Sequence, residues 1–316
     1  MGLTIGIDVG GTKIAAGVVD DAGKVIARRQ IPTAAKHPTA IVAGIVKVAQ
    51  ELKATASDVT AIGIGAAGLI DSENGVVLSA PNIAWENVQL RAMVADRVDV
   101  PVVIENDANV AAWGEALYGA GSGYGDQIMV TVGTGVGGGI IIGKQIYRGA
   151  HGVGAELGHM IIDASNPAVC ACGNHGDFEA LASGNSIGRR ARERADEPGA
   201  RGVLELAGGK GADITGELVG EAAKSGDVWA TEIVAETGHW LGVGIANLIT
   251  IFDPNVVVVA GGAAAGTGDL LLAPARDTAA QLIIGHAWRK PPPILPAALG
   301  YDAGLVGAAA LARDAG

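Results

Sequence analysis

The sequence predicts a two-lobed α/β protein, and three observations support this fold class. Short apolar segments with the patterns of strands alternate with longer segments whose apolar residues recur at helical spacing. The opening order of strand, glycine turn and strand returns at residue 127, so the chain contains an internal echo. A chain of 316 residues is long enough for two lobes. Two such lobes favour a cleft between them, where small-molecule sites are common.

The first lobe is expected to contain the first part of the chain together with its end. Its first helix is indicated by apolar residues at helical spacing, namely Ile41, Val42, Ile45, Val46 and Leu52. The expected strands are 3–9, 13–20, 25–31, 60–65 and 101–107, and the expected helices are about 38–53, 87–97 and 108–119.

The second lobe is expected to repeat the hairpin and then to become mainly helical. Its expected strands are 127–132, 139–146 and 255–260, and a helix over about 226–251 is stopped by Asp253 and Pro254. A last helix begins at about residue 303. The expected boundaries are 1–118 plus 303–316 for the small lobe and 119–302 for the large lobe.

Composition and charge exclude several classes of protein. Hydrophobic residues make up 49% of the chain, which indicates a folded protein. With 22 basic and 33 acidic residues the net charge is −11, which disfavours a nucleic-acid partner. The first residues lack the pattern of a signal peptide, and the longest charge-free helical run is too short to span a bilayer. We therefore expect a cytoplasmic protein without a membrane partner, and its 2 cysteines do not form a disulfide framework.

The segment DVGGTK places Asp8 at the end of a strand and Gly10, Gly11, Thr12 and Lys13 in the turn that follows. Amides that converge in such a turn make a nest for an anion, and Asp8 is placed to hold a magnesium ion through water. A plain hairpin turn is the alternative, since glycine pairs are common in hairpins. The motif alone leaves both interpretations open.

The segment GTGVGGG contains the spacing G-x-G-x-x-G at Gly133, Gly135 and Gly138. A dinucleotide site of the Rossmann kind needs a helix directly after this motif, whereas GIIIGKQI is β-branched and predicts a strand. A second phosphate-binding hairpin, with Thr134 as a donor, fits better because the turn repeats the features of the first.

A third glycine turn follows the predicted buried strand NVVVVA, at Gly261 and Gly262. A glycine pair at the end of a parallel strand lets a flat ring lie against the backbone. Taken by itself, an ordinary turn from strand to helix is the favoured interpretation of this segment.

Asn106 and Asp107 close the segment IEND at the end of a strand, just before a helix. Asp107 is suited to cap that helix. It is also placed to act as a general base, since phosphoryl transfer to a hydroxyl needs a carboxylate within hydrogen-bond reach of the attacking O–H. Asn106 beside it is suited to orient another hydroxyl. A single aspartate does not decide between these roles.

The most polar stretch of the chain, residues 151–182, holds both cysteines. Glu156 and His159 are three residues apart and share a face on a helical turn. His159, Cys170, Cys172 and Asp177 offer one nitrogen, two thiolates and one oxygen, a set that suits tetrahedral zinc. Two buried thiols with a core histidine are the alternative, which spacing alone slightly favours. A redox pair fits least, because no Cys-x-x-Cys motif is present.

Taken together, these motifs resemble the ROK family of sugar kinases, within the actin-like ATPase superfamily. The resemblance covers the whole chain and rests on the order DVGGTK, GAAGLID, PNIAW, IENDAN, TVGTGVGGG, ELGH, CACG, VVVAGG and PAALGYDAGLVGAAALA. Within the family the chain is most similar to the actinobacterial ATP-dependent glucokinases. The resemblance implies an actin-like, ribonuclease H-like fold of two lobes with a central cleft.

The resemblance also implies roles for individual residues. Asp107 matches the catalytic base that deprotonates the sugar 6-hydroxyl. The implied sugar-binding residues are Gly68, Asn106, Asp107, Glu156, His159 and Glu179. The turns at Gly10–Lys13 and Gly133–Gly135 match the family's phosphate loops, and Gly261–Gly262 matches the adenosine side.

The cysteine cluster departs from the usual family pattern, C-x-C-G-x-x-G-C-x-E. Cys170, Cys172 and Glu179 match it, but Asp177 stands where the third cysteine belongs. A carboxylate is a harder ligand than a thiolate, so the affinity for zinc is expected to fall. His175 is a substitute ligand to consider. A zinc ion bound here would be structural, holding the loop that carries His159 and Glu179.

The resemblance implies ATP- and magnesium-dependent phosphorylation of D-glucose to glucose 6-phosphate by a homodimer or homotetramer. Mannose, fructose or an N-acetylhexosamine as acceptor, and polyphosphate as donor, are alternatives within the family. A sugar-sensing repressor is disfavoured, because residue 4 already begins the first strand and leaves no room for a DNA-binding domain before it. An actin-like nucleotide switch would explain the hairpins but not Glu156, His159 and Glu179.

Overall fold

The computed structural model describes residues 2–35, 37–80 and 83–315. Pro81 and Asn82 of the PNIAW motif therefore lie outside the described residues. The chain divides into two compact units, which comprise Met1–Gly125, Gly139–Ala155 and Ala298–Gly316 in the first, and Asp126–Gly138 and Glu156–Ala297 in the second. The lobe boundaries expected from the sequence stay a prediction, because compactness alone does not show which segments move as one body.

A five-stranded mixed sheet forms the centre of the first unit. Its strand order is β3-β2-β1-β4-β8. The strands are β1 (Leu3–Val9), β2 (Lys13–Val19), β3 (Val25–Pro32), β4 (Val59–Ala66) and β8 (Val102–Asn106). The first three pair antiparallel, whereas β4 and β8 run parallel to β1. A small antiparallel sheet accompanies them, made of β5 (Leu69–Asp71), β6 (Val76–Ala80) and β7 (Trp85–Val88).

A second five-stranded mixed sheet has the order β11-β10-β9-β12-β13. Its strands are β9 (Gln127–Val132), β10 (Val136–Ile142), β11 (Gln145–Ile146), β12 (Val256–Ala260) and β13 (Ile294–Pro296). In the first sheet an antiparallel ribbon of three strands continues into two parallel strands. In the second sheet β11 pairs antiparallel with β10, and β12 runs parallel to both β9 and β13, so the same order of hairpin and parallel strands returns. The predicted α/β class and the predicted internal echo are therefore confirmed.

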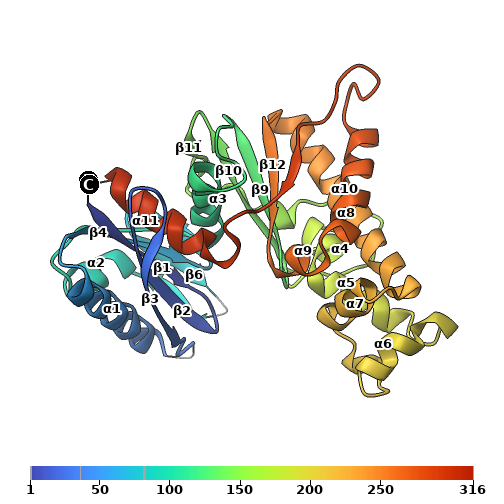
Figure 1. Cartoon of the computed structure of the whole chain (residues 1–316), viewed down its shortest axis with the longest axis horizontal. Coiled ribbons are helices and arrows are strands. Elements are labelled where there is room, and N and C mark those ends of the chain that lie inside the picture. Colours follow the sequence, from blue (N-terminus) through green and yellow to red (C-terminus); the bar gives the residue numbers. More distant parts are fainter. Residues whose placement is uncertain (1, 36, 81–82, 316) are drawn as a thin grey trace. The chain divides into compact units, whose positions relative to one another are not determined.

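Helices cover both faces of the first sheet (Figure 1). These helices are α1 (Pro38–Thr55), α2 (Leu90–Ala95), α3 (Asp107–Tyr118) and α11 (Ala303–Ala315). Ile5 and Ile7 of β1 pack into the cluster that includes α1, and Gly6 between them faces the other side of the sheet. A Cβ atom at Gly6 would lie 1.8 Å from the carbonyl oxygen of Leu305, so the absence of a side chain lets α11 lie directly on the sheet.

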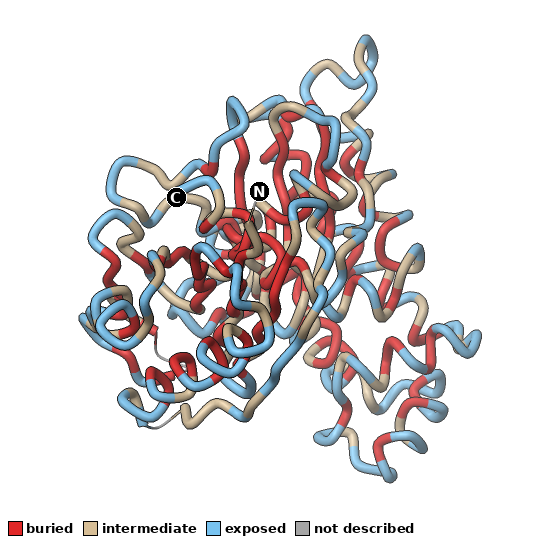
Figure 2. Tube along the Cα trace, turned by 60° about the vertical axis from the view of Figure 1, so that its left-hand side comes forward, coloured by how far each residue is buried: buried red, intermediate tan, exposed pale blue. Residues whose placement is uncertain are grey.

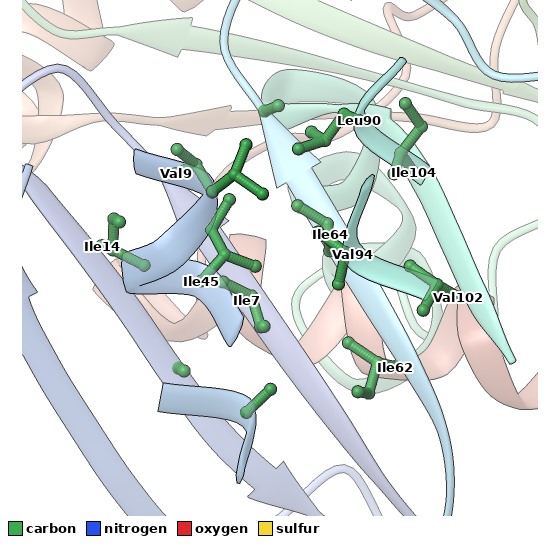
Figure 3. Close-up of a cluster of buried hydrophobic side chains, with 14 of the residues drawn as sticks. Ile7, Val9, Ile14, Ile45, Ile62, Ile64, Leu90, Val94, Val102 and Ile104 are labelled. Atoms are coloured by element: carbon green, nitrogen blue, oxygen red, sulfur yellow. The ribbon is translucent and has the colours of Figure 1, made fainter. Parts of the chain in front are cut away.

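The core of the first unit is mainly aliphatic. Its branched side chains interdigitate between the sheet, α1 and α2 (Figure 3), as drawn for Ile7, Val9, Ile14, Ile45, Ile62, Ile64, Leu90, Val94, Val102 and Ile104. Burial is concentrated on the central strands (Figure 2), and α11 is buried on all sides over most of its length. Strand-end residues of β1 and β8 are therefore held by a rigid platform.

The second unit is mainly helical after its glycine turn. Its helices are α4 (Phe178–Ala182), α5 (Gly184–Glu193), α6 (Arg201–Leu206), α7 (Gly216–Lys224), α8 (Val228–Phe252), α9 (Gly262–Thr267) and α10 (Asp269–Leu282). The long helix α8 confirms the expectation for 226–251, and its C-cap Asp253 adopts a left-handed conformation with φ of 45°. Pro254 follows and cannot continue the helix.

Two expected elements differ from the structure. The helix expected over 87–97 is wrong in its first part, because Trp85–Val88 pairs with β6 and the helix begins only at Leu90. The strand expected over 139–146 is interrupted at Gly143 and Lys144, which turn with positive φ between β10 and β11. Within the described residues, every helix is too short or too polar to cross a bilayer.

Candidate functional site

The first glycine turn joins β1 to β2 as a closed hairpin. The amide of Gly10 donates to the carbonyl of Lys13 at 3.0 Å, and the hydroxyl of Thr33 donates to the carbonyl of Gly10 at 2.7 Å. Gly11, Thr12 and Lys13 are exposed at its tip. The ammonium of Lys13 lies 5.5 Å from the centre of the Tyr301 ring. The amide of Gly10 is therefore engaged within the turn, and the exposed tip carries the donors that remain for an anion.

Two aspartates of the first unit interact electrostatically. Burial, and after it the negative charge of Asp107, raise the pKa of Asp8 to about 6, while Lys13 acts in the opposite direction. Burial also raises the pKa of Asp107, which the N–H of Ala108 partly offsets by donating to the carboxylate at 2.9 Å. Gly304 lies so near that a Cβ atom there would sit 3.3 Å from Cγ of Asp8. Two carboxylates that resist ionisation together form a place where a cation is favourable.

Asn106, rather than Asp107, caps α3. The side-chain oxygen of Asn106 accepts from the amides of Ala108 and Asn109 at 2.9 and 3.1 Å, and Asp107 is already the first helical residue. The expectation that Asp107 suits the capping position is therefore wrong. Because the cap is made by its neighbour, the Asp107 carboxylate is left for another role.

The side chain of Asn106 also holds the backbone at Gly68. Its amide nitrogen donates to the carbonyl of Gly68 at 3.0 Å. Gly68 has φ of 112°, and a Cβ atom there would lie 2.3 Å from the carbonyl oxygen of Ser79. Only glycine fits this position without strain, so the GAAG loop is held close to the end of β8.

The second glycine turn is seated on the start of α5. Gly133 donates to the carbonyl of Gly135 at 2.9 Å, and Gly184 donates to the carbonyl of Gly133 at 2.8 Å. The side chain of Thr134 is exposed. A Cβ atom at Gly135 would lie 2.1 Å from a carboxylate oxygen of Glu179, so a side chain here would displace that carboxylate.

Gly261 and Gly262 differ in their surroundings. Gly261 has φ of 99° and lies so close to β9 that a Cβ atom would sit 2.4 Å from the carbonyl oxygen of Val132. A Cβ atom at Gly262 would meet no atom within 4 Å. The missing side chain of Gly261 lets the end of β12 lie against β9, whereas the missing side chain of Gly262 leaves open space at the start of α9.

Four side chains of the second unit form a cluster with metal-ligand chemistry. One atom from each of His159, Cys170, Cys172 and Asp177 lies within 4.8 Å of the others. Nδ1 of His159 lies 3.7 Å from Sγ of Cys170 and 3.5 Å from Oδ2 of Asp177, which lies 3.5 Å from Sγ of Cys172. Ligand atoms around tetrahedral zinc are roughly 3.3 to 3.8 Å apart, given the usual bond lengths.

The donor set therefore fits a zinc ion. Burial raises the pKa of the Cys170 thiol, a tendency that a bound cation would reverse. His175 lies apart from this cluster, with its Nδ1 3.4 Å from the carbonyl oxygen of Pro167. The fourth ligand position of the cluster is therefore occupied by the carboxylate of Asp177 and not by the imidazole of His175.

Glu179 connects the cluster to the second glycine turn. One of its carboxylate oxygens accepts from the amide of Val136 at 3.0 Å, and the other accepts from the thiol of Cys170 at 3.4 Å. Within the second unit the structure thus brings together a predicted sugar ligand, a predicted phosphate turn and the cysteine cluster. This link was not anticipated, because 43 residues separate Val136 from Glu179.

Glu156 and His159 lie at the two ends of one short turn. The amide of His159 donates to the carbonyl of Glu156 at 3.2 Å, around the 3-10 helix Leu157–His159. Both side chains are exposed. A Cβ atom at Gly158 would lie 2.0 Å from the carbonyl oxygen of Val136, so this turn is fixed against the start of β10.

One buried pair of the first unit was missed by sequence reasoning. Glu105 is 1% exposed, and the guanidinium of Arg148 donates to it at 2.6 Å. The sequence does contain one signal of a buried acid, because a glutamate stands between the apolar segment PVVI and the pair Asn106–Asp107. Its partner lies 43 residues away and carries no motif.

Comparison with known proteins gives a match to the ROK family over residues 4–315. The chain belongs to the ROK family. It is 43% identical over 316 residues to a glucokinase of Streptomyces coelicolor, covering 99% of this chain and 98% of that one.

Solved structures of ROK proteins agree with this assignment. A ROK family glucokinase from Streptomyces griseus, crystallised with glucose and AMPPNP, is 44% identical, with a TM-score of 0.87 and coverage of 99% and 100% of the two chains. A ROK hexokinase from Thermus thermophilus is 33% identical, with a TM-score of 0.82 and coverage of 99% and 98%. The predicted family and its two-domain actin-like fold are thereby confirmed.

Proposed function

We propose that this chain transfers the terminal phosphoryl group of ATP to the 6-hydroxyl of D-glucose. Asp107 carries this proposal, because its carboxylate lies at the end of β8 and is released from helix capping by Asn106. The Streptomyces relatives support it, since one is a glucokinase and the other was crystallised with glucose and an ATP analogue.

Asp107 is proposed to accept the proton of the attacking hydroxyl. A general base works best when its pKa lies near the operating pH. Burial raises the pKa of this carboxyl above its ordinary value, which moves it in that direction. The group must be ionised before transfer, and the N–H of Ala108 favours the ionised form.

The glycine turns are proposed to bind the nucleotide. Gly10–Lys13 and Gly133–Gly135 would hold the phosphates through backbone amides and the hydroxyls of Thr12 and Thr134. Gly262 leaves room beside the start of α9 for the adenosine. Asp8 would hold magnesium, a cation that offsets charge on the phosphates during transfer.

The sugar is proposed to be bound by Asn106, Glu156, His159 and Glu179, close to the backbone of Gly68. Carboxylates suit a polyol, because each accepts hydrogen bonds from several hydroxyls. Glu179 accepts a hydrogen bond from the amide of Val136 and is therefore preorganised for this role. The zinc cluster would then be structural and would fix the segment that carries Glu179.

Assembly as a homodimer or homotetramer is proposed as well. Large apolar side chains exposed on the second unit, such as Ile284 at 70% and Trp288 at 91%, support an interface. Sedimentation analysis at enzyme concentrations used for assays measures the assembly state, and a monomer throughout would contradict it.

The decisive experiment is a panel of donors and acceptors, with ATP and polyphosphate tested against glucose, mannose, fructose and N-acetylglucosamine. We expect the highest kcat/KM for ATP with glucose. The variant Asp107→Asn should lose about a thousandfold or more in kcat while binding glucose with nearly the parental affinity in calorimetry. The matched control is Asp58→Asn, which alters an exposed aspartate of the same unit.

Two outcomes would count against this assignment. A near-parental kcat in Asp107→Asn would remove the base from the mechanism. A higher kcat/KM for another hexose, or for polyphosphate, would assign one of those alternatives instead.

A further inference from the structure

Beyond the residues proposed to touch substrate, the first unit contains an ion pair between a buried glutamate and a half-buried arginine, next to the proposed base. We propose that Glu105 and Arg148 are positioning residues, which hold the end of β8 so that Asn106 and Asp107 keep their working geometry. This inference deepens the proposed function and rests on it for the role of Asp107.

The Glu105 carboxylate accepts hydrogen bonds from three donors. One oxygen accepts from the backbone amide of Asn106 at 2.9 Å and from the side-chain amide of Asn109 at 3.1 Å. The other oxygen accepts from Nε of Arg148 at 2.6 Å. Since Glu105 is 1% exposed, these three donors replace its hydration.

Asn109 shows how strongly this carboxylate orients its neighbours. Its nitrogen points to Glu105, and its buried side-chain oxygen has no hydrogen-bond partner in the part of the chain that the structure describes. A buried polar atom without a partner is costly. The orientation of the Asn109 side chain is therefore set by its hydrogen bond to Glu105, although its own oxygen is left without a partner among the described residues.

Arg148 supplies the countercharge from a loop. Among the described residues it is the cation that pairs with Glu105. The side chain is 35% exposed, and its backbone carbonyl accepts from the amide of Gly154 at 2.8 Å. Gly149 and Gly152 have φ of 70° and 75°, so the loop is folded back on itself around Arg148.

The pair acts on Asp107 through one short path. Glu105 orders the amide of Asn106, and the side chain of Asn106 caps α3 and holds Gly68. Asp107 follows directly as the first residue of α3. Without the guanidinium, the buried Glu105 carboxylate has no countercharge and is expected to turn toward water. That movement would remove its hydrogen bond to the amide of Asn106 and loosen the start of α3.

A double-mutant cycle tests this role, with the variants Arg148→Met, Glu105→Gln and the two combined. Exchange of the backbone amides in a peptide spanning 105–110 is followed by mass spectrometry, together with kcat and the KM values for glucose and ATP. Arg148→Lys keeps a cation and serves as the conservative variant. Arg201→Met is the matched control, because Arg201 and its partner Glu205 are 87% and 68% exposed.

We expect Arg148→Met to speed exchange in this peptide about tenfold and to lower kcat about tenfold, with the KM for ATP within about twofold of the parent. Adding Glu105→Gln should restore part of both losses, since a neutral amide needs no countercharge. Arg148→Lys should lie between the parent and Arg148→Met, and Arg201→Met should match the parent.

Unchanged exchange over 105–110 in Arg148→Met would overturn the inference, as would a double variant that shows only the sum of the two single losses. A loss of thermal stability without any change in this peptide or in kcat would also overturn it, because that pattern belongs to a general structural pair. If the parent phosphorylates none of the hexoses, the proposed function fails, while the exchange measurements still decide whether the pair orders Asn106.

Discussion

At the residue scale, Asp8 and Asp107 are carboxylates of one unit that burial affects in the same direction. Both have a raised pKa, and the charge of Asp107 contributes to the shift of Asp8. Asp8 also interacts with Lys13, whose positive charge limits that shift. A folded protein that binds the protons of such groups more tightly than the unfolded chain loses stability as the pH rises.

The pH dependence of stability should therefore report on Asp8. Its ordinary pKa is 3.8 and its folded pKa is about 6. Between these values the unfolded chain releases the proton while the folded protein keeps it, so the free energy of unfolding falls by about 3 kcal/mol across this window. Well below pH 3.8 Asp8 does not lower the free energy of unfolding, and well above pH 6 it lowers it by the full amount.

Urea unfolding of the parent and of Asp8→Asn, at pH 4 and at pH 7, measures this contribution. The stability of the variant minus that of the parent should rise by about 2.4 kcal/mol between the two pH values, because at pH 4 the unfolded carboxyl is already more than half ionised. A difference that does not change with pH would show that Asp8 ionises as easily in the folded protein as in the unfolded chain.

At the element scale, α4 depends on one carboxylate with two tasks. Oδ1 of Asp177 accepts from the amide of Ala180 at 2.8 Å and caps the helix, while Oδ2 faces Cys172 and His159. The family's cysteine at this position would supply a thiolate but a poorer cap. The first turn of α4 carries Glu179, so the cap, the candidate metal ligand and the proposed sugar ligand lie within three residues of one another.

Three substitutions at this position should separate the two tasks. Asp177→Asn keeps a good cap and removes the anionic ligand, so the melting temperature in EDTA should stay near the parental value while zinc affinity falls. Asp177→Cys should raise zinc affinity and cost about 1 kcal/mol of stability in EDTA. Asp177→Ala should lose both properties. Zinc affinity is measured by competition with a chromophoric chelator.

Asp227 provides the matched control for this series. It caps α8 in the same way, with Oδ1 accepting from the amide of Ala230 at 2.8 Å. Asp227→Asn should leave zinc affinity unchanged. If all the Asp177 variants bind zinc as the parent does, the carboxylate is a cap and not a ligand.

At the scale of the whole molecule, the last helix of the chain, α11, packs on the first unit, whose sheet is formed by the N-terminal part of the chain. The helix α11 lies on β1 and β4 through glycines on one face of the sheet (Figure 1). A Cβ atom at Gly63 would lie 1.8 Å from the carbonyl oxygen of Ala308. Because the Ala308 carbonyl is part of the backbone and not a flexible side chain, a Cβ atom at position 63 would push α11 away from the sheet.

Gly63→Ala should therefore cost about 3 kcal/mol or more in the free energy of unfolding. Gly266→Ala in α9 is the control, since a Cβ atom there meets nothing within 4 Å and alanine favours the helix. Chemical denaturation of both variants gives the comparison. Equal stabilities would mean that α11 is not packed directly on the sheet.

Much of the fold followed from local patterns. Strands 3–9 and 127–132, helix 38–53 and the long helix that ends at Asp253 are encoded by periodicity and turn residues among near neighbours. The helix expected over 87–97 failed at its start, because the pairing of Trp85–Val88 with β6 overrides the local preference. Of the candidate site, spacing offered His159, Cys170, Cys172 and Asp177 as a possible zinc set but slightly favoured a plain buried core, and only the structure shows that their ligand atoms lie together.

The sequence by itself determined the family, the order of the glycine turns and the identity of the acids, because these are properties of residue type and spacing along the chain. Only the tertiary structure decided that Asn106 caps α3 in place of Asp107, that Glu179 accepts from Val136, and that Arg148 compensates Glu105. Each of these depends on atoms within about 3 Å of one another, and at that range geometry rather than residue type selects the partner.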